Sequence, residues 1–345
     1  MRDKDTIYIL KIVTVIAALI GFVWFVYYIS WVIELTVISL LIVYILFPIV
    51  ELLKNHLKFS HFSAVGVAFL LFLLLIVILI SLIVPIVQIE LRAIIRDLPH
   101  YVKQFQLLAE ELSDYLTSFD LNVEFSDIIP DLSSNLRTVL EEVANISITV
   151  VASIVDMFFI AFIVFFLLYD FQNIRDNIIK IIPVRYEKYG RDVLQIIDRN
   201  FGGYIRGNIV RCTIVGIATG IALYIAGMPY ALLLGIIAGV LNVILYIGPY
   251  VAAFPAILIS VSPNTPSIMV VILIYLVVQT IDGTVLAPLL LGRAVKLKPV
   301  TVIICLLIGG ELAGFLGIII SIPLAGIVRS LIEYFREGLN VGLKD

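Results

Sequence analysis

Three acidic residues lie inside strongly apolar stretches of the sequence, where a charge is unfavourable. Glu311 and Asp282 are near the end of the chain, and Asp156 is about half-way along an earlier apolar block. A charge at the middle of a bilayer costs about 2.5–3.5 kcal/mol on insertion scales, so such residues are expected to have a function or a partner. Glu311 and Asp282 are the first candidates for a carboxylate that couples transport to a proton or cation. Each acid also has a structural alternative. Glu311 could make a buried structural hydrogen bond, and Asp282 could cap a broken helix near Pro288. Asp156 could pair with a group on a neighbouring helix.

Amides and arginines supply the other candidate contacts to a solute. Asn242 and Gln279 each offer donors and acceptors, which suits a hydroxyl-rich solute, although lone amides in membrane helices often bond one helix to another. Arg206, Asn208 and Arg211 are predicted at a cytoplasmic entrance, and Arg293 belongs to a later basic group. Arginines at such an entrance either set topology and contact lipid headgroups or capture an anionic solute.

The elements that would position these residues are two stretches bounded by prolines. Asn242 lies thirteen residues after Pro229 and thirteen before Pro255, whereas Glu311 lies twelve after Pro299 and twelve before Pro323. A helical arm of this length spans about 18 Å, little more than half of the hydrocarbon core. The spacing predicts two discontinuous helices or re-entrant hairpins with tips at Asn242 and Glu311, although two ordinary full spans with coincidental prolines would read similarly.

A span at 209–226 precedes the first stretch and one at 267–287 precedes the second, so the two hairpins would enter from opposite faces. A span plus a hairpin, repeated upside down, is an inverted repeat of the kind found in many secondary transporters. Glycine and proline residues would provide its hinges and tips: Pro229, Gly248, Pro249, Pro255, Pro288, Gly292, Pro299, Gly309, Gly310 and Pro323.

The bulk composition places all of this in a membrane. Of 345 residues, 62% are hydrophobic and 14% charged, and the mean hydropathy is +1.14. These values exclude a soluble protein, because an ordinary soluble domain is about one quarter charged. The fold class is therefore all-α, a polytopic helical membrane protein. A net charge of −3 gives no basic face for nucleic acid.

The chain divides into five predicted regions: N-terminal spans (1–89), an extracytoplasmic helical insert (90–145), a fourth span with a cytoplasmic amphipathic connector (146–208), the transport core (209–336) and a cytoplasmic tail (337–345). The insert is acidic and the connector basic, which by the positive-inside rule predicts cytoplasmic N- and C-termini in the cell membrane.

A helical stripe runs along the insert. Leu91, Leu98 and Phe105 recur every seven residues, with Ile94 and Tyr101 three positions after the first two. The stripe predicts an arm that packs on its own membrane domain or contacts another subunit, and we expect a homo-oligomer. Pro99 should kink this helix or end its first part.

The motifs of the second half resemble the autoinducer-2 exporter-like family of membrane proteins. The similar segments are Tyr169-Asp170, Tyr204-Ile-Arg-Gly-Asn208, Gly227-Met-Pro-Tyr-Ala231, Tyr246-Ile-Gly-Pro249 with Pro255, Gln279-Thr-Ile-Asp282 with Pro288 and Gly292, and Leu297-Lys-Pro299 through Gly309, Gly310, Gly314 and Gly317 to Pro323. Two positions depart from the family: Leu245 stands where proline is common, and Asp282 where many members have glutamate. The resemblance implies a transporter for export of the quorum-sensing furanone signal or for sodium/proton antiport.

These features favour a secondary transporter of a small polar solute or a monovalent cation, coupled to H⁺ or Na⁺. ATP drive within this chain is disfavoured because the sequence has no Gly-Lys-Ser/Thr phosphate loop, and no cofactor, metal site or catalytic motif is expected. A channel would differ by flux that does not saturate. A receptor or scaffold that binds a partner through the 90–145 insert is the alternative of another class.

Overall fold

The computed structural model describes residues 28–117, 154–291 and 297–341, and also 13–14, 17–18, 20–21, 24–25 and 138. All regular elements in these ranges are helical, which confirms the predicted all-α class. They are α2 (Ser30–Leu57), α3 (His61–Thr117), α5 (Ile154–Ile181), η1 (Val184–Tyr186), α6 (Glu187–Ile225), α7 (Ala231–Leu241), α8 (Gly248–Ile259), α9 (Ile268–Ile281), the π-helix η2 (Asp282–Leu286), α10 (Ala287–Leu291) and α11 (Pro299–Val341). Within the predicted N-terminal spans (1–89), most of residues 1–27 lies outside the described residues, and so does most of the 118–145 part of the insert.

Six of the described helical stretches are long and apolar enough to cross a bilayer: Ser30–Leu57, His61–Glu111, Val155–Ile181, Val184–Ile225, Ile268–Leu291 and Pro299–Arg336. Two shorter apolar helices, Ala231–Leu241 and Gly248–Ile259, accompany them. The prediction of a polytopic helical membrane protein is therefore confirmed.

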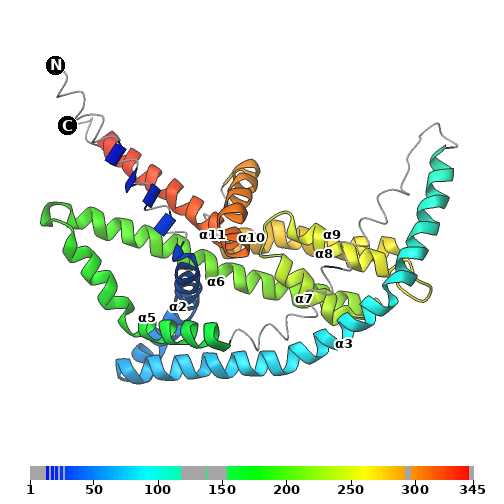
Figure 1. The fold of residues 1–345 in the computed structure, drawn as a ribbon, viewed down its shortest axis with the longest axis horizontal. Helices are drawn as coiled ribbons and strands as arrows, with labels where there is room; N and C mark the ends of the chain where they lie inside the picture. Colours follow the sequence, from blue (N-terminus) through cyan, green and yellow to red (C-terminus); the bar gives the residue numbers. More distant parts are fainter. Residues whose placement is uncertain are drawn as a thin grey trace, which may run out of the picture.

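Helix α6 runs through the middle of the molecule. In Figure 1, α2 and α5 lie on one side of it, and α9, α10 and α11 lie on the other. One apolar core joins α2, α3 and α5 through residues such as Val43, Val65 and Val164, and a second joins α6 to α10 and α11 through residues such as Tyr204 and Val302. Helix α6 is thus the element against which α7, α9, α10 and α11 pack.

Helix α6 also corrects an expectation about the connector. The amphipathic connector and the predicted fifth span form one continuous helix of 39 residues rather than two elements. No proline interrupts this sequence, and Gly207 inside it allows the backbone of α10 to pack closely, since a Cβ there would overlap the carbonyl of Leu290. The small residues of α6 are therefore contact points and not breaks.

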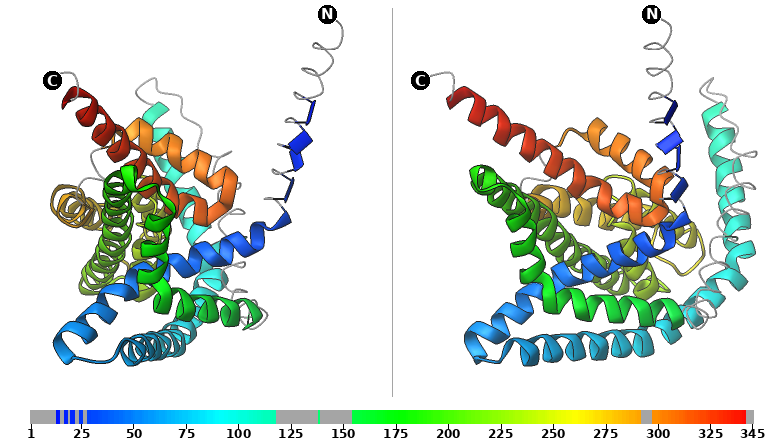
Figure 2. Two further views of the ribbon diagram at one scale, coloured as in Figure 1. Left: turned by 90° about the vertical axis from the view of Figure 1, so that its left-hand side faces the viewer. Right: turned by 60° about the vertical axis from the view of Figure 1, so that its left-hand side comes forward.

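Helix α3 is longer than expected. It has 57 residues, about 85 Å at 1.5 Å per residue, and it continues through Pro85 and Pro99, so Pro99 does not end it. Figure 2 shows it curving along the outside of the molecule. Leu91, Ile94 and Leu98 of the predicted stripe are buried where α3 packs on α7 and α8. This packing supports the helix at the proline, and the described part of the arm rests on its own membrane domain.

Helices α6 and α7 approach each other through paired glycines. Gly216 and Gly220 of α6 face Gly235 and Gly239 of α7, and a Cβ on Gly235 would lie 2.7 Å from the Cα of Gly220. Small residues four apart allow the backbones of membrane helices to come this close. The contact brings the end of α7, and therefore Asn242, beside α6.

Gly235→Ala should force α6 and α7 apart, because the atoms that the new methyl group meets belong to backbone and cannot rotate away. We expect the free energy of unfolding in detergent to fall by about 1–3 kcal/mol. Gly66→Ala is the matched control, since a Cβ at Gly66 meets nothing within 4 Å. Equal stability of the two variants would show that the glycine contact does not hold the helices together.

The first proline-bounded stretch folds as a helical hairpin. Helices α7 and α8 have 11 and 12 residues and are joined by a turn that begins at Asn242. Leu234 of α7 belongs to the same apolar core as Ala256 of α8, and a Cβ on Gly248 would overlap the carbonyl of Leu241. Asn242 is therefore at the tip, as the proline spacing predicts.

The second stretch also turns back on itself. The backbone of α11 is broken at Ala313 and Gly314, where Gly314 has φ of 55°, and Gly309 and Gly317 pack backbone to backbone across the break. The tip thus follows Glu311 by two residues. The second arm does not end at Pro323 but continues to Val341, about 40 Å of helix, so this arm is long enough for a full span.

Candidate functional site

A buried cluster of polar side chains lies where α6, the tip of the α7–α8 hairpin and η2 meet. Arg211 and Asn208 of α6 are 1% and 5% exposed, Asn242 of the hairpin tip is 0% exposed and Asp282 of η2 is 2% exposed. Asn242 and Asp282 lie in strongly apolar sequence, whereas Asn208 and Arg211 follow a polar part of α6. Four of the predicted site residues are therefore brought together from three elements.

Arg211 is the centre of the cluster. Its Nε donates to Asp282 Oδ1 at 2.9 Å and to Oδ2 at 3.2 Å, and its Nη1 donates to Asn208 Oδ1 at 3.0 Å. Its Nη2 donates to the main-chain carbonyl of Asn242 at 3.0 Å. All three nitrogen atoms of the guanidinium thus donate hydrogen bonds.

The side chain of Asn242 completes the cluster. With its amide oxygen turned toward Arg211, it accepts from Nη2 at 3.0 Å and from Nε at 3.3 Å. The opposite orientation would place an NH₂ group against another donor, so the hydrogen-bonding chemistry favours the first. The hairpin tip is therefore bound to Arg211 through both its main chain and its side chain.

The cluster is electrically neutral but expensive to disturb. Removing one member of a buried ion pair leaves an uncompensated charge and typically costs about 3–5 kcal/mol, whereas an apolar pair of similar volume is often as stable as the ions. Net stabilisation of the fold therefore does not by itself explain the Arg211–Asp282 pair. Neutralising Asp282 would remove the charged partner of Arg211 and leave its guanidinium with only amide and carbonyl acceptors.

The backbone around Asp282 is irregular, which places the carboxylate at a break. Asp282 is the first residue of η2, and Pro288 follows as the second residue of α10. Proline lacks an N–H and crowds the carbonyl four residues earlier, so it favours a wider turn just before it. Single π-turns within α-helices frequently occur at functional sites.

Glu311 lies outside this cluster. It is exposed, at the end of the first arm of α11 and just before the break at Ala313. None of the described hydrogen bonds or ion pairs involves its carboxylate. It is therefore the acid of the second hairpin tip, and it does not share the environment of Asp282.

The remaining predicted residues are distributed around the core. Gln279 is half-buried on α9, Asp156 is half-buried in the first turn of α5, and the half-buried Arg206 donates to the carbonyl of Tyr44 at 3.0 Å. Pro229 precedes α7, Pro299 begins α11 and Pro249 is in the first turn of α8, whereas Pro255 and Pro323 are inside helices. Gly310 stands one residue before Glu311, while Gly292 and Arg293 lie outside the described residues.

The structure adds residues that the sequence patterns did not single out. Glu90 of α3 accepts from the main-chain N–H of Leu233 at 3.0 Å, so it caps the N-terminus of α7, and Asp97 accepts from the hydroxyl of Tyr230 at 3.1 Å. Both acids border the buried stripe residues Leu91 and Leu98, a position that could have marked them. They attach the long arm to the base of the first hairpin.

Comparison with known proteins gives a consistent assignment. The model of the family described as "AI-2E family transporter" matches residues 12–337. "Putative transport protein YrrI" of Bacillus subtilis is 35% identical over 193 residues, which are 55% of this chain and 55% of that protein, so the match spans about half of its length. "Putative transport protein YueF" of the same organism is 28% identical over 71% of this chain and 69% of its own, and "Putative permease PerM" of Escherichia coli is 27% identical over 71% of each.

Proposed function

The chain belongs to the AI-2E transporter family, a family of membrane transporters, and from this premise we propose that it is a secondary transporter of a small polar solute, coupled to H⁺ or Na⁺ through Asp282. The observation that carries the proposal is the buried Arg211–Asp282 pair, which joins α6 to a hairpin tip and to a break in the helix. Substrate and ion sites formed by discontinuous helices are a recurring arrangement in secondary transporters.

The pair suggests how an ion could be coupled to movement. When Asp282 accepts a proton it loses its charge, and the guanidinium of Arg211 is left with only amide and carbonyl partners. A Na⁺ ion would act similarly by competing with Arg211 for the carboxylate oxygens. In either case the attachment between η2 and α6 weakens, and the hairpin tip that Asn242 supplies is free to change its position.

Two repeated units would provide the movement. The second half of α6 with the α7–α8 hairpin forms one unit, and α9, η2 and α10 with the folded α11 form the other. In our proposal these are inverted repeats, with Asp282 and Asn242 at one site and Glu311 as the acid of the second tip. In this arrangement the basic residues in the first half of α6 face the cytoplasm, in line with the positive-inside rule, and both termini do so as well.

The family resemblance implies two kinds of substrate, a furanone signal or Na⁺. A sodium/proton antiporter would use the same carboxylate, alternately bound to Na⁺ and to H⁺. The amides of Asn208 and Asn242 offer hydrogen bonds that suit a hydroxyl-rich solute and that a bare cation does not need.

The test is flux through the purified full-length chain in liposomes, with Na⁺, H⁺ and the furanone signal followed in parallel. We expect saturable transport of one substrate, counterflow of unlabelled against labelled substrate, and stimulation by an opposing proton or sodium gradient. Flux that rises without saturation would indicate a channel. Absence of flux for all three from inserted, folded protein would contradict the proposed function.

A further inference from the structure

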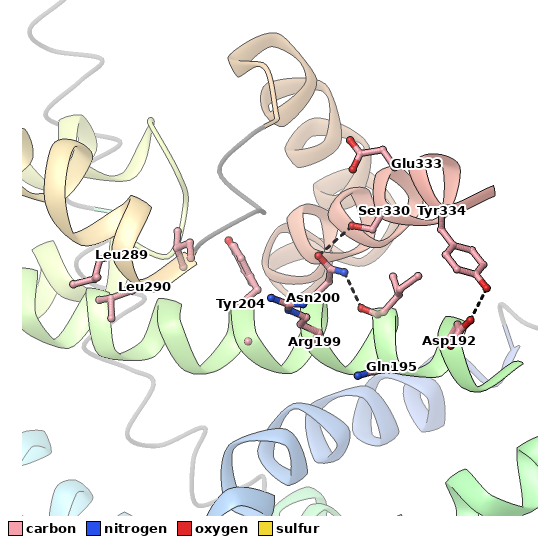
Figure 3. Close-up of a pocket in the computed structure, with 13 residues that line it drawn as sticks. Asp192, Gln195, Arg199, Asn200, Tyr204, Leu289, Leu290, Ser330, Glu333 and Tyr334 are labelled. Carbon is pink, nitrogen blue, oxygen red and sulfur yellow. Dashed lines mark hydrogen bonds between the residues drawn. The ribbon is translucent and has the colours of Figure 1, made fainter. Parts of the chain in front are cut away.

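A large cavity opens beside the polar cluster. It has a volume of about 770 Å³ and lies between the first half of α6, α10 and the second arm of α11 (Figure 3). Gln195, Arg199 and Tyr204 line it from α6, Leu289 from α10 and Ser330 from α11. Cavities that accept small molecules generally have volumes of about 300–1,000 Å³, so this one is large enough for a small solute.

The far walls of the cavity are connected by hydrogen bonds. Tyr334 donates from its hydroxyl to Asp192 at 2.6 Å, and Ser330 donates to Asn200 at 3.3 Å. Figure 3 shows these bonds linking α11 to α6 on one side of the cavity, with Tyr204 and the leucines of α10 on the other. One side of the cavity is therefore formed by α6 and α11, which these hydrogen bonds connect. The other side is formed by the short helix α10.

The end of the cavity nearest the polar cluster is closed by backbone contact. Gly207 of α6 packs so closely against Leu290 of α10 that a Cβ on the glycine would overlap the leucine carbonyl. Tyr204, 2% exposed, precedes Gly207 by one turn, and Asn208 follows it. The cavity residues and the cluster residues are thus consecutive along α6, and the Gly207–Leu290 contact separates them.

Helix α10 is a short segment that directly follows the break at η2. It has only five residues, and η2 immediately precedes it, so a change in the π-turn would lift α10 without unfolding a long helix. Asp282, the first residue of that π-turn, is the partner of Arg211. Release of Asp282 and displacement of α10 would therefore occur in the same segment of chain.

We propose that the cavity is the cytoplasmic vestibule of the transport pathway and that α10 is its gate, closed by the contact between Leu290 and Gly207. This extends the proposed function by giving the solute a route to the Arg211–Asp282 cluster. The hydroxyl, amide and charged groups of the vestibule fit a small polar solute that passes α10 when the π-turn releases it.

The test uses the buried Cys212, which lies 3.8 Å from Asn208 inside the cluster, as a reporter in a Cys305→Ser background. Gly207→Ala should force α10 away from α6, and the rate at which a small water-soluble maleimide labels Cys212 should rise by about tenfold or more as the open population grows. Gly203→Ala is the matched control one turn earlier, because a Cβ there meets nothing within 4 Å. Equal rates of Cys212 labelling in the two folded variants would contradict the proposal that α10 is a gate.

A second variant tests whether the cavity is part of the transport pathway, and it can be used if Gly207→Ala does not fold. Gly203 lines the vestibule, so a bulky maleimide attached to Gly203→Cys should abolish flux, whereas the same reagent on Arg191→Cys, outside the vestibule, should not. Unchanged flux after complete labelling at 203 would overturn the vestibule. Since labelling of Cys212 requires no transport, a failure of the gate is distinguishable from a failure of the proposed function.

Discussion

Replacing Arg211 by methionine should lower the free energy of unfolding by about 3–5 kcal/mol, because Asp282 would then be buried without a partner for its charge. The side chain of Arg211 is 1% exposed and that of Asp282 2%, so water cannot take the place of the guanidinium. The double variant Arg211→Met/Asp282→Leu removes both charges and should recover most of the lost stability. Thermal or denaturant unfolding of the three proteins in the same detergent measures the difference.

The surface pair between Arg329 and Glu333 provides a control. Its side chains are 42% and 53% exposed and lie four residues apart on one helix, so Arg329→Met should change stability by less than about 1 kcal/mol. If Arg211→Met were as mild as Arg329→Met, the buried pair would not be a charged pair in the folded protein.

Asp282→Asn should reduce coupled flux by about a hundredfold or more, a loss of roughly 2.7 kcal/mol at 1.36 kcal/mol per tenfold, while the protein stays folded. Asparagine keeps the size of the side chain and can still accept a hydrogen bond from Arg211, but it cannot exchange a proton or attract a cation. Asp282→Glu keeps the charge and can still exchange a proton or attract a cation, so it should retain substantial flux. Initial rates in liposomes under an imposed gradient provide the measurement.

Glu311→Gln is the comparison for this prediction. The sequence alone favours Glu311 over Asp282 as the coupling carboxylate, but in the structure Glu311 is exposed and separate from the buried cluster. We therefore expect a loss of less than about tenfold at Glu311, since its environment does not amplify the effect of one charge. Inactive Glu311→Gln beside active Asp282→Asn would move the coupling site to the second hairpin tip.

Local signals in the sequence predicted the hairpins well. Prolines and glycines restrict or free the backbone at their own positions, so the tip at Asn242 and the break after Glu311 follow from their spacing. The same residues do not mark where α3 and the second arm of α11 end. Pro99 and Pro323 are accommodated inside helices there, because side-chain packing compensates for a missing hydrogen bond.

The partners within the site could not be predicted in the same way. Arg211 and Asp282 are 71 residues apart, and no local pattern in the sequence relates them to each other. Arg211 read as one of several cytoplasmic arginines, yet it is buried whereas Arg206 is only half-buried. Only the packing of α6 against α7, which depends on glycines in both helices, brings Arg211 to Asn242.

The measurement that bears most directly on the Arg211–Asp282 pair is the coupled flux of the Arg211→Met/Asp282→Leu double variant in liposomes, at a protein density and stability matched to the wild type. If the pair serves transport, this stable protein should show no flux above that of empty liposomes. Flux at the wild-type rate, with the same dependence on the imposed proton or sodium gradient, would contradict a role for the pair in coupling.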